Sequence, residues 1–166
     1  MTQATVYSDH DHSECIARAL QAVSEVCERR GLRLTPLRKQ ILEIIWRSHK
    51  PIGAYSIMHE LADISFREQV APPTVYRSLD FLLKHRLVHR VHSQNAFIGR
   101  RNPSAPGCEA LLICTECGHA EEVPTRAIEQ TINLSANERK FSVNEQVLEI
   151  IGCCRFCRAK KEKLLS

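Results

Sequence analysis

Two short cysteine pairs constrain this chain more than any other feature of its sequence. Cys114 and Cys117 form the first pair, Cys154 and Cys157 form the second, and each pair encloses two residues. This spacing lets one tight turn present two sulfur atoms to one ion. Two such turns complete a tetrahedral shell of four thiolates, which selects zinc over harder cations. The pairs therefore predict a structural zinc site that joins two distant segments.

Two other interpretations of these cysteines are a pair of unrelated buried thiol clusters and a thiol–disulfide centre. The redox interpretation is disfavoured because there are two pairs and neither opens a helix within a βαβ unit. The 36 residues between the pairs have to contain a helix and a strand of their own. Cys153 directly precedes Cys154, but only Cys154 keeps the two-residue spacing.

Length and composition exclude several classes of protein. A chain of 166 residues, 43% hydrophobic and 25% charged, fits one compact domain or two small ones and is neither disordered nor collagen-like. No apolar run approaches the roughly 20 residues that cross a bilayer, and residues 1–15 lack a hydrophobic signal core. We expect a cytoplasmic protein without a membrane or small-molecule partner. Because no catalytic triad, phosphate-binding loop or carboxylate pair stands out, we do not expect an enzyme.

The placement of charge is more informative than its total. The formal net charge is +4, which is mild for a nucleic-acid-binding protein. Residues 29–50 carry seven Lys and Arg against the single acid Glu43. Residues 81–101 carry five Lys and Arg, three His and no acid. Two basic clusters in an otherwise balanced chain predict one positively charged face.

Apolar periodicity predicts four helices followed by a β-hairpin. Four stretches have helical spacing, and two short β-prone runs follow them. Thr35 is expected to cap the second helix, with Pro36 at its first position. Helices followed by a basic hairpin predict a winged helix-turn-helix. The helices are expected at residues 13–31, 35–48, 54–64 and 72–85, and the hairpin strands at residues 87–92 and 96–98.

The predicted fold class is α+β with two small domains. Residues 1–12 are expected to form a flexible tail and residues 13–98 a winged-helix DNA-binding domain. Residues 99–108, which hold two Gly and two Pro, predict a hinge. A small α/β domain with the four-cysteine site is expected at residues 109–166. Its strands are expected at residues 110–113, 121–123 and 141–151, and its helices at residues 125–134 and 158–165.

The sequence PPTVYRSLDFL at residues 72–82 has the pattern of a DNA-reading helix. With its apolar positions packed inward, Thr74, Arg77 and Ser78 share another face that suits phosphate oxygens and base edges. An Arg in this position can make two hydrogen bonds to guanine in the major groove. The plainer interpretation is an ordinary capped helix with one solvated Arg.

These motifs together resemble those of the ferric uptake regulator superfamily. Residues 72–82 are similar to its recognition-helix motif, residues 32–38 (LRLTPLR) resemble its second-helix signature, and the cysteine pairs match its structural zinc site in order and spacing. The resemblance covers roughly residues 15–157. Further segments are closer to the zinc-uptake-regulator branch than to the iron branch. These segments are residues 53–55, 87–90 and 95–99.

The resemblance implies a homodimeric, metal-dependent repressor that binds double-stranded DNA. Residues 109–166 then form the dimerisation and metal-binding domain. A dimer matches a two-fold operator, with its two reading helices about one DNA turn, or a multiple of it, apart. The resemblance implies that Tyr55 and Arg77 approach bases. Together with Thr74 and Tyr76 they are the residues expected to contact DNA.

Zinc-uptake regulators usually build their regulatory zinc site from a His after the recognition helix, a Cys after the wing, a His before the first cysteine pair and a Glu after it. His89 and Glu122 match the first and the last. The Cys position is Arg100, whose guanidinium stays protonated and does not bind zinc. The second His position is Gly107, with Cys108 beside it. The implied ligands are therefore His89, Cys108 and Glu122. We expect this site to bind zinc more weakly than a four-ligand family site, unless Cys108 takes over as the thiolate and Arg100 turns outward to DNA or solvent.

The fourth regulatory ligand is left open, and every candidate has a plainer interpretation. The histidines can simply add to a basic wing, Cys108 can be a free loop thiol, Glu122 can solvate a strand end, and the tail can be loose. The His that often stands in the last strand is Ile151 here, which argues against a second sensing site. The candidates for the fourth ligand are His92, His119, His10, His12 and Cys15.

The sequence predicts a zinc-responsive repressor of zinc-uptake genes with one structural and one regulatory zinc per chain. Zinc at the hinge is expected to favour one closed arrangement of the DNA-binding domains. The first rival is a member of the same superfamily with only structural zinc and altered or absent sensing. The others are an iron or peroxide sensor, which needs a His/Asp-rich shell that this chain lacks, and a thiol–disulfide enzyme. Zinc stoichiometry, one or two per chain, separates the sensing from the non-sensing regulator.

Overall fold

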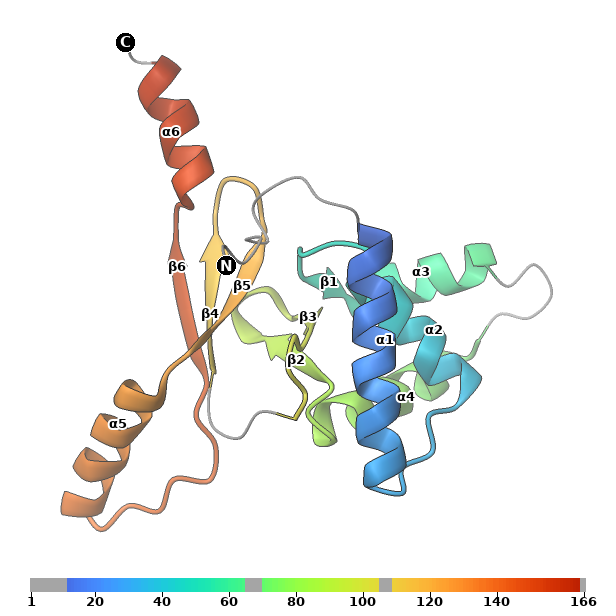
Figure 1. The fold of residues 1–166 in the computed structure, drawn as a ribbon, viewed down its shortest axis with the longest axis horizontal. Helices are drawn as coiled ribbons and strands as arrows, with labels where there is room; N and C mark the ends of the chain where they lie inside the picture. Colours follow the sequence, from blue (N-terminus) through green and yellow to red (C-terminus); the bar gives the residue numbers. More distant parts are fainter. Residues whose placement is uncertain (1–11, 65–69, 105–108, 165–166) are drawn as a thin grey trace. The chain divides into compact units, whose positions relative to one another are not determined.

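The computed structural model describes residues 12–64, 70–104 and 109–164. The chain divides into two compact units, Met1–Ser104 and Ala105–Ser166. The first unit is a winged helix (Figure 1). Its elements are α1 (His12–Arg29), α2 (Pro36–Trp46), β1 (Ile52–Gly53), α3 (Ala54–Ile64), α4 (Pro72–Lys84), β2 (Val88–Val91), a 3-10 turn (His92–Gln94) and β3 (Ala96–Gly99).

One apolar core holds the first unit together. All four helices and the start of the wing contribute side chains to a single buried cluster. Each fully buried aliphatic side chain stabilises the fold by roughly 1.5–3 kcal/mol, so this unit has a core that needs no metal. Its largest fully buried side chains are Ile41, Leu42, Ile44, Ile45, Ile57, Leu61, Leu79, Leu82 and Leu87.

The second helix begins as its sequence predicts. The Thr35 hydroxyl accepts a hydrogen bond from the backbone N–H of Arg38 at 3.4 Å, and Pro36 occupies the first helical position. The cap satisfies one of the orphan N–H groups at the helix start, and the proline ring presets the helical φ angle. The predicted start of α2 is therefore confirmed.

The wing is a three-stranded antiparallel sheet in the order β1–β3–β2. His89 lies opposite Ile98, and Arg90 lies opposite Phe97. The hairpin β2–β3 is confirmed, but the sequence did not predict β1. Its two residues are too few to show the period-2 alternation by which strands are recognised.

Gly99 ends β3 directly against the ring of Trp46, which is 7% exposed. A Cβ at this position would lie 2.2 Å from Cε2 and 2.3 Å from Nε1 of that ring. The missing side chain of Gly99 therefore lets the wing close over α2.

We expect Gly99→Ala to destabilise the first unit by about 1–3 kcal/mol, because the buried indole has to shift to admit a methyl group. Thermal unfolding followed by the fluorescence of the single tryptophan measures this loss, which corresponds to roughly 4–8 °C per kcal/mol. Gly53→Ala is the matched control, since nothing lies within 4 Å of a Cβ built there. Equal melting temperatures for the two variants would contradict the prediction.

The second unit is a small sheet in the order β5–β4–β6, with α5 and α6 extending from its opposite ends (Figure 1). β4 pairs antiparallel with β5 and parallel with β6. Neither α5 nor α6 has a buried residue, and the buried apolar residues of this unit lie in β4 and at the start of β5. The elements are β4 (Glu109–Cys114), β5 (Ala120–Pro124), α5 (Arg126–Glu138), β6 (Leu148–Gly152) and α6 (Arg155–Leu164).

The fold class is confirmed, with two corrections in the second unit. The strand predicted at residues 141–151 begins only at Leu148, and the last helix begins at Arg155 rather than at residue 158. Phe141 and Val147 are 66% and 50% exposed. Their apolar spacing resembles that of a strand, although among the described residues no strand pairs with residues 141–147. Among the described residues, no helix is both long and apolar enough to cross a membrane.

Candidate metal centre and DNA-binding surface

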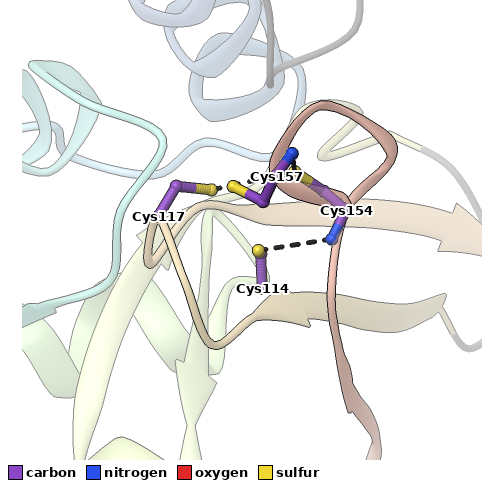
Figure 2. A group of neighbouring side chains, drawn as sticks. All are labelled: Cys114, Cys117, Cys154 and Cys157. Atoms are coloured by element: carbon purple, nitrogen blue, oxygen red, sulfur yellow. Dashed lines mark hydrogen bonds between the residues drawn. The ribbon is translucent and has the colours of Figure 1, made fainter. Parts of the chain in front are cut away.

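The sulfur atoms of Cys114, Cys117, Cys154 and Cys157 lie within 4.8 Å of one another and point toward a common centre (Figure 2). Those of Cys117 and Cys154 are 4.0 Å apart. Tetrahedral zinc with Zn–S bonds of about 2.3 Å separates its sulfurs by about 3.8 Å. The four thiols therefore fit one zinc ion, and their spacing is far too long for a disulfide.

Sheet topology explains why cysteines so distant in sequence meet. β4 and β6 are parallel, with Cys114 in register with Gly152, so both strands end at the same edge of the sheet. Cys114 ends β4 and Cys117 lies in the turn that follows, whereas Cys154 lies between β6 and α6 and Cys157 lies in the first turn of α6. Gly118 closes the first turn with a φ of 74°, a left-handed conformation that favours glycine.

Backbone N–H groups point at the sulfurs. The N–H of Cys154 donates to Sγ of Cys114 at 3.3 Å, and the N–H of Cys157 donates to Sγ of Cys154 at 3.5 Å. The second contact lies in the first turn of α6, where N–H groups have no partner within the helix. Such donors stabilise thiolates, the form of cysteine that binds metal.

Cys114 and Cys157 differ in how readily they lose a proton. Burial alone raises the pKa of Cys114, but the backbone N–H groups of Cys154, Cys117 and Glu116 lower it to about 6. The side-chain hydrogen bond with Cys154, together with burial, raises the pKa of Cys157 to about 12. Zinc has to displace the remaining protons on binding, so zinc affinity at this site rises with pH.

An ion pair that sequence reasoning missed connects the two cysteine turns. Lys161 Nζ of α6 donates to Glu116 Oε1 of the first turn at 2.7 Å. Both side chains are well exposed, so the pair stabilises the fold by at most about 1 kcal/mol. Because α6 buries no residue, this ion pair adds to the attachment that the cysteines give the helix.

The predicted regulatory ligands lie on separate elements. Glu122 is on β5, on the same sheet face as Glu109 of β4, and their carboxylate oxygens lie within 4.8 Å of one another. Sequence reasoning missed Glu109, although its place five residues before the first pair could have indicated it. His89 is half-buried on β2 of the first unit. Cys108 lies outside the described residues.

The other residues considered for this site belong to several elements of the two units. Arg100 is 3% exposed, so its side chain is buried and is not turned outward, which was the alternative considered for it. His92 is exposed in the wing turn, His119 is half-buried beside the first pair, and Cys15 is half-buried in α1. His12 begins α1, and His10 lies outside the described residues.

The exposed part of α4 has the features predicted for a DNA-reading helix. Thr74, Tyr76 and Arg77 are exposed in its first half, and Tyr55 is 81% exposed at the start of α3. Ser78 corrects the prediction, because it is 6% exposed and its hydroxyl donates to the carbonyl of Thr74 at 2.9 Å. It therefore serves the helix interior and not the reading face.

Four helices with a three-stranded wing define the first unit as a winged-helix module, and the second is a small α/β module with a four-cysteine metal site. The chain belongs to the ferric uptake regulator family, whose model matches residues 29–151.

Individual relatives add detail. The zinc uptake regulation protein of Escherichia coli (strain K12) is 32% identical over 139 residues, which are 83% of this chain and 80% of that protein. A zinc uptake regulator complexed with zinc and DNA has a TM-score of 0.80 at 30% identity, covering 93% of this chain and 99% of the other. The crystal structure of holo XcZur matches with a TM-score of 0.77 at 38% identity, and the match covers 84% of this chain and 96% of the other.

Proposed function

We propose that this protein is a zinc-responsive transcriptional repressor of zinc-uptake genes, acting in the cytoplasm as a homodimer with one structural and one regulatory zinc per chain. The four-sulfur cluster carries the proposal, because it occurs in a chain whose winged-helix unit leaves Tyr55, Tyr76 and Arg77 exposed. Similarity to a zinc uptake regulator complexed with zinc and DNA supports it. The direct test is to add zinc to protein that carries only its structural zinc and to follow binding to promoter DNA by fluorescence anisotropy.

In this proposal α4 enters the major groove and reads bases from its first half. Arg77 carries the most sequence information, because guanidinium donates two hydrogen bonds to O6 and N7 of guanine. Thr74 and Tyr76 contact phosphates or neighbouring bases, and Tyr55 approaches from α3.

We expect Arg77→Ala to weaken specific DNA binding by about 1–3 kcal/mol and to relax the preference at one base pair of each half-site. Binding to a panel of single-base variants of the operator measures both effects. Arg18→Ala, which removes a charge from the exposed surface of α1, is the control. A uniform loss over all sequences would show that Arg77 contacts only phosphate. Tyr55→Phe is expected to cost less.

The proposed dimer interface lies on the second unit. β6 is an edge strand, and its Ile150 and Ile151 are 49% and 58% exposed. α5 adds the exposed side chains of Ile128 and Leu134. An apolar surface of this kind is characteristic of an interaction site, and a second copy of the same unit is the partner that the dimer proposal supplies.

The regulatory zinc is proposed to bind His89, Cys108 and Glu122. Imidazole, thiolate and carboxylate are all zinc ligands. Zinc shifts the population toward the DNA-binding arrangement only if it binds that arrangement more tightly than the others. The proposal therefore requires a zinc affinity that changes when DNA is bound.

The second candidate function is a DNA-binding regulator that holds only structural zinc. Arg100 and Gly107 favour it, because they stand where ligands are expected from the family resemblance. Zinc content separates the two candidates: two zinc ions per chain support the sensor, and one supports the alternative.

A further inference from the structure

Three side chains stack at the C-terminal end of α4, away from the residues proposed to read bases. The guanidinium of Arg38, on α2, lies 3.5 Å from the centroid of the Phe81 ring. The His85 ring, one turn further along, lies 4.5 Å from the same ring, centroid to centroid. A cation and an imidazole therefore both pack against the same ring near the end of the helix.

Further positive groups surround this stack. Arg30, at the end of α1, donates to the backbone carbonyl of His85 at 3.1 Å. Lys84 is exposed in the last turn of α4. Arg38 donates to the carbonyl of Arg33 at 2.6 Å, a contact that uses one of the five N–H groups of a guanidinium.

The surrounding positive charges affect the pKa of the His85 imidazole. Burial, followed by the charges of Lys84, Arg30 and Arg38, lowers the pKa of His85 from its ordinary value of 6.5. The three charged groups that lower this pKa are positive, and they come from α4, from the residue that follows α1 and from α2. An anion placed among them relieves their mutual repulsion and restores the proton to His85.

The length of α4 bears on which anion its C-terminal end meets on DNA. Its thirteen residues span about 20 Å. With the first half of the helix at the base edges, as in the proposed function, the cations at its other end lie outside that base-reading half, and the phosphate groups that border the groove are the anions that DNA offers them. A helix C-terminus carries partial negative charge and repels phosphate unless cations reverse the local potential.

We propose that Arg38, Lys84 and His85 form a phosphate-binding cluster that holds the DNA backbone at the C-terminal end of α4. The inference rests on the DNA binding of the proposed function and adds a contact outside the base-reading half of the helix. Phosphate contacts position a protein on DNA without reading its sequence. The cluster therefore sets the register of α4 in the groove.

Proton uptake follows from the same arrangement. In the free protein the lowered pKa keeps His85 neutral at pH 7. A bound phosphate favours the imidazolium and raises that pKa, so the complex binds more protons than the free protein. DNA affinity therefore increases as pH falls through the pKa that His85 has in the complex, and it levels off below the pKa of the free protein.

The test uses the full-length, zinc-loaded protein and a DNA duplex of about 30 base pairs, roughly three helical turns. Binding is measured by fluorescence anisotropy over a range of salt concentrations and between about pH 6 and pH 8, a window that brackets the ordinary histidine pKa. The variants are Lys84→Gln and His85→Gln. Arg18→Gln, on the exposed surface of α1, removes the same charge elsewhere in the unit and is the control. Thermal melting checks that each variant is folded.

We expect Lys84→Gln to reduce the slope of log affinity against log salt by about 0.9 for each lost phosphate contact, equally for specific and random duplexes. We expect the wild type to bind up to about tenfold more tightly at the acidic end of the range, and His85→Gln to lose this dependence. The inference is overturned if Lys84→Gln has the same salt slope as Arg18→Gln, or if His85→Gln keeps the full pH dependence. Failure of the wild type to bind DNA under any condition would instead overturn the proposed function.

Discussion

Cys117→Ser is expected to unfold the second unit and to leave the first unit folded. The second unit has a thin core, because α5 and α6 bury no residue and, among its described residues, only five apolar ones are buried. A domain of about 60 residues is marginal even with a complete core. Structural zinc contributes about 10–16 kcal/mol of apparent binding free energy in small zinc domains. The free energy lost with one of the four ligands is therefore expected to exceed the free energy of unfolding of the second unit.

Three measurements test this expectation. Metal analysis after gel filtration should show one zinc fewer per chain, and the elution volume should show loss of the dimer. The fluorescence of Trp46 should still report a folded first unit, because its apolar core contains no metal ligand of this site. Cys153→Ser is the control, since Cys153 is exposed and is not part of the four-sulfur cluster. A Cys117→Ser protein that kept its zinc and remained a dimer would refute the assignment.

The sequence predicted secondary structure best in elements long enough for their apolar pattern to repeat. Helices of eleven residues or more, such as α2 and α4, complete several turns, so their apolar stripes and their starts were visible. β1 has two residues and offers no period. At residues 141–147 apolar residues were taken for a strand, but a single sequence does not distinguish apolar residues that pair in a sheet from apolar residues at the surface.

The start of α6 shows how the metal site shapes local structure. The helix begins at Arg155 because Cys154 accepts two hydrogen bonds from its first turn. The sulfur of Cys154 accepts from the backbone N–H of Cys157, and its carbonyl oxygen accepts from the N–H of Arg158 at 2.9 Å. The cysteine thus acts as the helix cap, a role usually filled by Ser, Thr, Asp or Asn. Sequence rules for caps do not include cysteine, so the predicted start came three residues late.

The candidate site was predictable to different degrees. The four-cysteine cluster followed from spacing alone, because spacing decides which sulfurs reach one ion. Contacts between side chains from different elements, such as Glu116 with Lys161 or Arg38 with Phe81, depend on tertiary packing and have no sequence signature. Ser78 was misplaced for the related reason that a hydroxyl can turn inward and bond its own helix.

Zinc-dependent DNA binding is expected to fail at low zinc when Cys108 or Glu122 is changed. Cys108→Ser and Glu122→Gln each remove a proposed ligand, and losing even an outer-shell partner of a metal costs about 10–100-fold in affinity. Each variant should therefore need at least about tenfold more zinc for half-maximal DNA binding. Glu121→Gln is the matched control, because Glu121 precedes Glu122 on β5 and its side chain lies on the other face of the sheet.

Arg100→Cys is expected to act in the opposite direction. Arg100 stands at a position where the family resemblance implies a thiolate, and its side chain is buried at 3% exposure. A guanidinium 4–6 Å from a dication opposes metal binding by several kcal/mol at an effective dielectric constant near 20. Replacing it with a thiol removes that repulsion and adds a ligand. The variant should bind DNA at lower zinc concentrations than the wild type.

The experiment titrates zinc into the wild type and the four variants, each loaded with structural zinc only, while anisotropy reports binding to the same duplex. If Cys108 and Glu122 bind the regulatory zinc, Arg100→Cys needs the least zinc for half-maximal DNA binding. The wild type and Glu121→Gln need equal, intermediate concentrations, and Cys108→Ser and Glu122→Gln need the most. If all five proteins bind the duplex equally well before any zinc is added, the regulatory site does not control DNA binding. In that case Arg100 occupies the position of a lost zinc ligand, and the chain is a DNA-binding regulator that uses zinc only to fold.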